Sequence, residues 1–78
     1  MERKEILDKV ISLVAETLEL DETSISADTV YKDLGADSFD LLELVTAFED
    51  EFGVTLDEDD VASIETVGET VDAIEKAQ

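Results

Sequence analysis

One stretch, residues 34–52, constrains the fold of this chain more than any other. Apolar residues recur in it at three- and four-residue steps, and the turn-forming Gly35 and Gly53 stand at its two ends. This spacing is typical of an amphipathic α-helix, because 3.6 residues per turn bring such positions onto one face. We therefore predict a helix from about Ser38 to Phe52, with Asp37 as its N-cap and Gly53 as its C-cap.

The predicted helix has two different apolar faces. The larger face should pack in the core, and it comprises Leu41, Leu44, Val45, Phe48 and Phe52. The opposite side carries a small apolar strip ringed by acids, here called the docking strip: Phe39, Leu42, Glu43, Thr46, Glu49 and Asp50. Scattered exposed apolar residues need no functional explanation. We nevertheless favour a surface for partner proteins, because carboxylates would steer basic partners towards the apolar contact area.

Three more segments have helical patterns. A first helix is predicted from near Glu2 to near Leu18, from an apolar stripe of Leu7, Val10, Ile11, Val14 and Leu18 that Ile6 and Leu13 flank. Asp57 is placed to cap a short helix from Glu58 to about Ser63. Thr66 and Glu69 match a capping box, which opens a last helix whose predicted buried stripe is Val67, Val71 and Ile74.

A long connection, residues 20–36, separates the first two helices, and no alternating pattern in it is long enough to predict a strand. Its spaced apolar residues are expected to hold it against the helices: Ile25, Val30, Tyr31 and Leu34. The predicted fold is therefore all-α, a four-helix bundle of three main helices and one short helix with a long loop after the first helix. With 78 residues, we expect residues 1–78 to form one domain.

The charge balance narrows the choice of partners. The chain has 23 Asp and Glu against 5 Lys and Arg, a formal net charge of -18. Residues 33–75 contain fifteen acids and no Lys or Arg. Such a surface repels nucleic acids and anionic membranes and attracts proteins with basic patches. We therefore expect protein partners, no nucleic acid and no membrane insertion.

Several kinds of chemistry are excluded by composition. The chain has no Cys and no His, so it has no disulfide, no thiol nucleophile and no histidine base. The acidic run at residues 57–60 lacks the glycine and glutamate of an EF-hand loop, so we predict weak, nonspecific cation binding and no metal site. No signal peptide or membrane-spanning run is apparent, and we expect a cytoplasmic location.

Ser38 is the residue with the clearest chemical potential. A serine at a helix start is usually only a cap. Here Asp37 can cap the helix, which leaves the Ser38 hydroxyl free to face solvent. A phosphodiester on Ser38 would meet unpaired N–H groups and the helix dipole, worth about 0.3–1 kcal/mol. Without a His or Cys partner, Ser38 is better suited to accept a group than to attack a substrate.

In the motif Leu34-Gly35-Ala36-Asp37-Ser38 the chain resembles the acyl carrier proteins, specifically the free-standing type of dissociated fatty-acid synthesis. The family signature is Asp-Ser-Leu at the head of an acidic, apolar helix, and here Phe39 replaces the leucine. The family often has a proline after the residue that matches Leu56, where this chain has Asp57. The resemblance covers nearly the whole chain and leaves intact the groups that the modification requires.

The resemblance implies a role. Ser38, flanked by Asp37, would carry a 4′-phosphopantetheine arm that a phosphopantetheinyl transferase attaches from coenzyme A. The thiol of the arm would hold growing acyl chains as thioesters for the malonyl transferase and the condensing, reducing and dehydrating enzymes. The protein would be a carrier, not an enzyme, and a monomer. Besides packing the core, some apolar residues would shelter the acyl chain, and this shelter set comprises Leu41, Val45, Phe48, Leu56, Ile64, Val67 and Val71.

Other readings of the same sequence stay open. A carrier for polyketides or another specialised acyl product would share the motif. A protein that mimics nucleic acid would share the large negative charge, but this interpretation gives no role to Asp37, Ser38 or the docking strip. An enzyme fits least, because only carboxylates could perform acid–base chemistry and no pair of them lies in an evident cleft.

Overall fold

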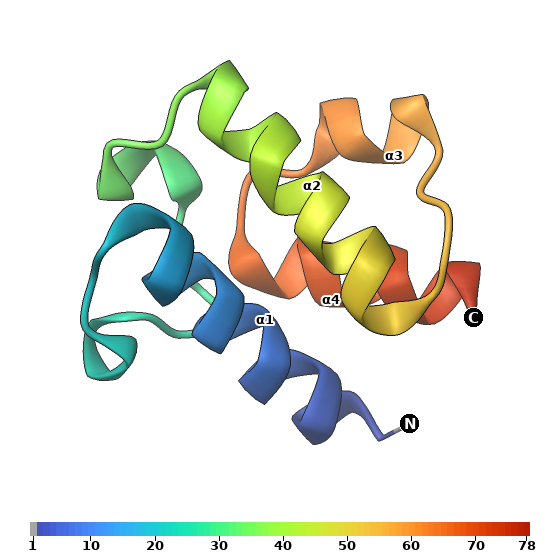
Figure 1. Ribbon diagram of the computed structural model, residues 1–78, viewed down its shortest axis with the longest axis horizontal. Helices are drawn as coiled ribbons and strands as arrows, with labels where there is room; N and C mark the ends of the chain where they lie inside the picture. The colour runs from blue at the N-terminus through green and yellow to red at the C-terminus, as the bar shows by residue number, and fades with distance from the viewer. Residues whose placement is uncertain (1) are drawn as a thin grey trace.

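Four α-helices and two 3₁₀ turns make up the computed structural model, which describes residues 2–78 (Figure 1). The α-helices are α1 (Arg3–Leu18), α2 (Ser38–Phe52), α3 (Glu58–Ser63) and α4 (Val67–Ala77), and the 3₁₀ turns are η1 (Glu22–Ser24) and η2 (Tyr31–Leu34). Within residues 2–78 no strand is formed, and extended pairing is limited to an isolated antiparallel bridge between Val30 and Thr66. The predicted all-α architecture, with three main helices and one short helix, is confirmed.

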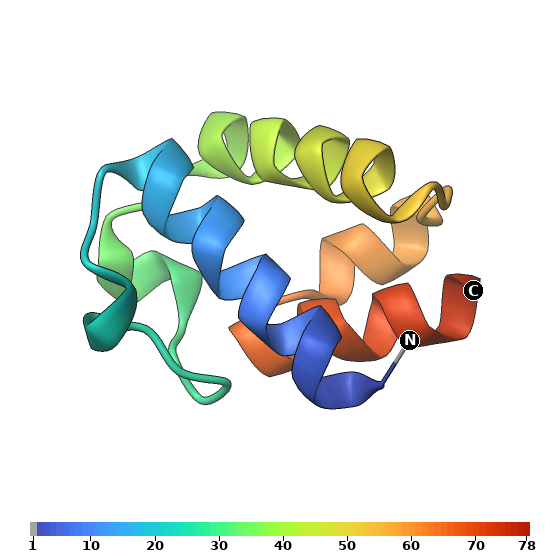
Figure 2. The same cartoon turned by 60° about the horizontal axis from the view of Figure 1, so that its bottom comes forward.

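The helices enclose one core. α1 contacts both α2 and α4, and α3 contacts α4. Figure 2 shows α2 lying along one side of the bundle, with α1 beside it and the long connection at the end of α1. That connection runs past the end of α1 and delivers the chain to the start of α2 (Figures 1 and 2). The fold therefore presents the first turn of α2 at one end of the molecule.

The buried face of α1 differs from the predicted one. Ile6, Val10 and Val14 have no exposed surface, whereas Leu7 and Ile11 are only half-buried. The prediction that Ile6 merely flanks the stripe is therefore wrong. α1 packs against two helices at once, so its most buried row points between α2 and α4. The predicted stripe on α4 is confirmed, because Val67, Val71 and Ile74 have no exposed surface.

The ends of α2 are fixed by local interactions. The Asp37 carboxylate accepts a hydrogen bond from the N–H of Asp40 at 3.0 Å, and the Asp40 carboxylate accepts one from the N–H of Asp37 at 3.3 Å. Gly53 ends the helix with φ at 64°, a left-handed conformation that glycine adopts without strain. Both predicted caps of α2 are confirmed, as is the capping box of Thr66 and Glu69 on α4.

Asp57 does not cap α3 as predicted. It occupies the N-cap position, but its side chain accepts no capping hydrogen bond. Instead the Glu49 carboxylate on α2 accepts a hydrogen bond from the N–H of the preceding residue, Leu56, at 2.9 Å. The start of α3 is thus tied to α2 through Glu49.

A buried tyrosine anchors the long connection. The Tyr31 side chain is 4% exposed, and its hydroxyl shares a hydrogen bond of 2.5 Å with the hydroxyl of Thr70 on α4. Burial raises the pKa of Tyr31 to about 12, so the hydroxyl remains protonated at neutral pH. The N–H of Tyr31 also donates to the Glu65 carbonyl at 3.0 Å. Together with the buried Ile25, these contacts confirm that the connection is packed against the bundle.

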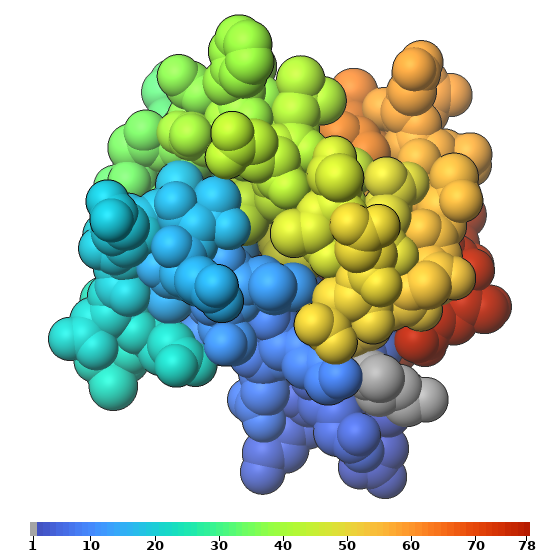
Figure 3. Space-filling view, in the orientation of Figure 1, coloured from blue at the N-terminus to red at the C-terminus, as the bar shows by residue number. Residues whose placement is uncertain are grey.

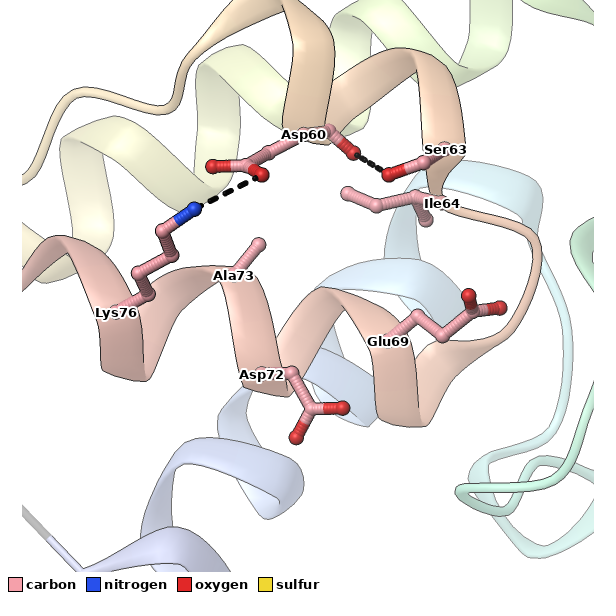
Figure 4. Close-up of a pocket in the computed structure, with 7 residues that line it drawn as sticks. All are labelled: Asp60, Ser63, Ile64, Glu69, Asp72, Ala73 and Lys76. Carbon is pink, nitrogen blue, oxygen red and sulfur yellow. Dashed lines mark hydrogen bonds and ion pairs between the residues drawn. The ribbon is translucent and has the colours of Figure 1, made fainter.

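Three of the five basic residues form ion pairs between helices. Arg3 on α1 pairs with Asp72 and Glu75 on α4, and Lys9 on α1 pairs with Glu51 on α2 at 3.2 Å. Figure 4 shows Lys76 on α4 paired with Asp60 on α3 at 3.4 Å, beside a small polar cavity between these helices. Exposed pairs contribute at most about 1 kcal/mol each. They nevertheless place positive charge where the acidic helices approach one another.

Candidate functional site

Ser38 is the first residue of α2 and is exposed. Asp37 supplies the capping carboxylate, and the Ser38 hydroxyl forms no hydrogen bond with another residue of the described chain, 2–78. The first N–H groups of the helix lack partners within it. The serine hydroxyl is therefore available to accept a group, in a position that tolerates a negatively charged substituent.

An open groove of about 720 Å³ adjoins Ser38. Its walls come from three parts of the chain: the connection before α2, the first turns of α2, and the link between α3 and α4. Tyr31 and Lys32 lie on the first wall, Leu41 on the second and Ile64 on the third. Two residues of the predicted shelter set, Leu41 and Ile64, are thus brought next to the candidate serine.

A second apolar groove runs between α2 and α3. It is lined by Leu42, Thr46 and Glu49 of the docking strip and by Val45 and Leu56 of the shelter set, together with Glu58, Val61 and Ala62. The α3 residues Glu58, Val61 and Ala62 were not predicted to belong to this surface. A helix of six residues has too little periodicity to show which side faces α2.

The shelter set does not form one cavity. Phe48, Val67 and Val71 have no exposed surface and line neither groove, so in this conformation they serve core packing. The other members divide between the two grooves. The role of these seven residues as a shelter for an acyl chain therefore stays a prediction.

The docking strip lies on the outer side of α2, as predicted, with one correction. Phe39 is 77% exposed and Leu42 is 60% exposed, and Glu43, Thr46 and Asp50 are exposed around them. Glu49 is only half-buried and its carboxylate is engaged by the N–H of Leu56, so it is in part a structural residue. In Figure 3, α2 forms a continuous band across the visible face.

Residues 2–78 contain neither a metal site nor a membrane-spanning helix. No group of three or more Asp and Glu side chains is arranged to hold a metal ion within this range. No helix in the same residues is both long enough and apolar enough to cross a bilayer.

Comparison with known proteins identifies the class of domain to which this chain belongs. A sequence model of the phosphopantetheine attachment site matches residues 8–74, most of the chain, so the bundle is a phosphopantetheine-bearing carrier domain. The chain is 48% identical to the acyl carrier protein of Thermotoga maritima over 75 residues, which cover 95% of this chain and 93% of that protein. It is 40% identical to the acyl carrier protein of Lactobacillus acidophilus over 79 residues, which cover 100% of this chain and 99% of that protein.

A solved structure agrees with these sequences. The acyl carrier protein of Enterococcus faecalis matches with a TM-score of 0.82 and 35% identity over 100% of both chains. The chain belongs to the acyl carrier proteins. Its cofactor is accordingly a covalently bound 4′-phosphopantetheine, which supplies a thiol on a flexible arm. It carries acyl groups for fatty-acid synthesis, as predicted from the resemblance of its sequence to that family.

Proposed function

We propose that Ser38 is the residue that carries the 4′-phosphopantetheine arm and that residues 1–78 act as a single carrier domain for growing acyl chains. The observation that carries the proposal is the exposed hydroxyl of Ser38 at the head of α2, where Asp37 already performs the capping. The neighbouring groove gives an attached arm an apolar surface to lie against. Without His or Cys the carrier itself would contribute no acyl-transfer catalysis.

Loading by a transferase tests this proposal. The purified protein is incubated with coenzyme A and a broad-specificity phosphopantetheinyl transferase, and its intact mass is recorded. We expect a gain of one phosphopantetheine, which peptide mapping should place on Ser38. If the protein is folded but gains no mass, the proposal is contradicted.

The docking strip and the adjoining groove between α2 and α3 support a second part of the proposal. The exposed Phe39 and Leu42 offer apolar contact area, and exposed acids surround them. Such a surface would receive basic patches of the transferase, the malonyl transferase and the condensing, reducing and dehydrating enzymes. These interfaces would be small and short-lived, because one carrier must leave each enzyme for the next. Two copies of this acidic protein would repel each other, which supports a monomer. We propose that the protein acts in the cytoplasm, together with these partners.

Reversing two charges of the docking strip should slow loading. We choose Glu43→Lys with Asp50→Lys, because both acids are exposed and neither forms an ion pair within residues 2–78. We expect kcat/KM of a basic transferase to fall by about tenfold or more at low salt, with helicity unchanged. The matched control reverses two exposed acids of the long connection, Glu22 and Asp28. Equal rates for the two double variants would remove the steering role from this face.

The shelter set supports a third part of the proposal. An acyl chain on the arm would enter beside Leu41 and Ile64, which line the groove at Ser38, and would separate residues that now pack together. Each added pair of methylenes that becomes buried should stabilise the folded state. We therefore expect the Tm of the acylated protein to rise with acyl-chain length. A Tm that stays constant across a series of chain lengths would contradict sheltering.

A further inference from the structure

Lys32 is in an unusual place for a cation in this protein. Residues 10–75 contain no other Lys or Arg, although the chain as a whole has 23 acids. Lys32 belongs to η2 (Tyr31–Leu34) and lines the same groove as Ser38. The single positive side chain in this long acidic stretch therefore lies beside the serine that we propose for the arm.

The structure gives Lys32 no evident role in stability. Arg3, Lys9 and Lys76 each pair with carboxylates on another helix, but Lys32 forms no ion pair within residues 2–78. Its side chain is exposed. The position of η2 is nevertheless well fixed, because the neighbouring Tyr31 is buried and bonded to Thr70. Lys32 is thus an exposed cation, without an ion pair in residues 2–78, on a turn that its buried neighbour holds in place.

Lys32 is the one cation among the residues that line the groove. Two acids line it, Asp37 and Glu65. The Asp37 carboxylate accepts a hydrogen bond from the N–H of Asp40, so Glu65 is the acid that would compete with a phosphodiester for Lys32. A phosphodiester on Ser38 would add a negative charge at the head of α2. The helix N-terminus favours that charge, and an ammonium group that lines the same groove would favour it further.

We propose that the Lys32 ammonium group binds the phosphodiester of the arm on Ser38 and holds the first part of the arm along the groove. This rests on the proposed attachment at Ser38. Lys32 is a positioning residue, because it would act on the arm and not on the reacting thioester. The arm would lie against Leu41 and Ile64 when docked and would leave the groove when a partner competes for it.

Reactivity of the arm's thiol tests the proposal. The loaded native protein and its loaded Lys32→Gln variant are treated with iodoacetamide, a small neutral thiol reagent, and alkylation is followed by mass. An arm that docks less often is alkylated faster, and loss of an exposed ion pair predicts a rate roughly two- to fivefold higher. Lys4→Gln is the matched control, because Lys4 also forms no ion pair within residues 2–78 and lies on α1. Lys32→Arg should retain the native rate.

Salt and a direct contact complete the test. At ~1 M NaCl, where the Debye length is about 3 Å, the rates of the native protein and Lys32→Gln should converge. In the loaded native protein, nuclear Overhauser effects should link the Lys32 ε-methylene to the methyl groups next to the arm's phosphate. Their absence, or equal alkylation of Lys32→Gln and Lys4→Gln at low salt, overturns the proposal. If the native protein cannot be loaded at all, the attachment at Ser38 fails first, which separates the two conclusions.

Discussion

Alanine in place of Ser38 should abolish the gain of one phosphopantetheine that the native protein shows with coenzyme A and a transferase. The hydroxyl oxygen is the atom that would form the phosphodiester, and alanine has no atom to replace it. Stability should change by less than about 0.5 kcal/mol, because Ser38 is exposed and Asp37 provides the cap. Intact mass reports the loading, and chemical denaturation followed by circular dichroism reports the stability.

The matched control for this variant is Ser12→Ala. Ser12 is also exposed on a main helix, and its hydroxyl forms no hydrogen bond to another residue in the range 2–78. Ser12→Ala should load like the native protein. Full loading of a folded Ser38→Ala variant would mean that another hydroxyl accepts the arm, and the assignment of Ser38 would be wrong.

The features of α2 that the sequence predicted are local ones. Its two ends depend on Asp37 and Gly53, whose effects on the backbone reach only a few residues. The exposure of Phe39 and Leu42 follows from the helical period once the larger apolar stripe is placed in the core. These predictions needed no knowledge of the other helices.

The features that could not be predicted from the sequence depend on how segments distant in the sequence pack against one another. The most buried residues of α1 are Ile6, Val10 and Val14, because both α2 and α4 pack against this helix. The apolar stripe in the sequence does not show which of its residues face the space between two partner helices. Glu49 has the pattern of a surface acid, but Leu56, seven residues further on, turns its N–H towards it.

In the candidate site, too, the local features could be predicted from the sequence and the tertiary ones could not. Ser38 was identified from its position at the head of a helix and from the motif around it. The groove beside it is built from η2, α2 and the link before α4, so its lining follows only from tertiary packing. The sequence shows that Lys32 is isolated among acids, but it does not show that Lys32 and Ser38 share a groove.

Two phenylalanine substitutions in α2 should separate its structural and functional faces. Phe48 has no exposed surface and is the largest fully buried side chain, so Phe48→Ala should cost about 3–5 kcal/mol by loss of burial and creation of a cavity. Domains of this size have a total stability of only about 4–12 kcal/mol, so we expect a substantial fraction of the variant to be unfolded at 37 °C. Denaturant titration followed by circular dichroism measures the loss.

Phe39→Ala makes the same change in side chain on the opposite face of the same helix. Since Phe39 is 77% exposed, its removal should alter stability by less than about 0.5 kcal/mol. It should instead lower kcat/KM for loading, because Phe39 directly follows Ser38 in the sequence and belongs to the docking strip. An interface anchor of this kind contributes more than about 1 kcal/mol, which corresponds to a loss of roughly fivefold or more. A large loss of stability in Phe39→Ala with unchanged loading would reverse the assignment of the two faces. A small loss in Phe48→Ala would show that the core of the bundle can close around the missing ring.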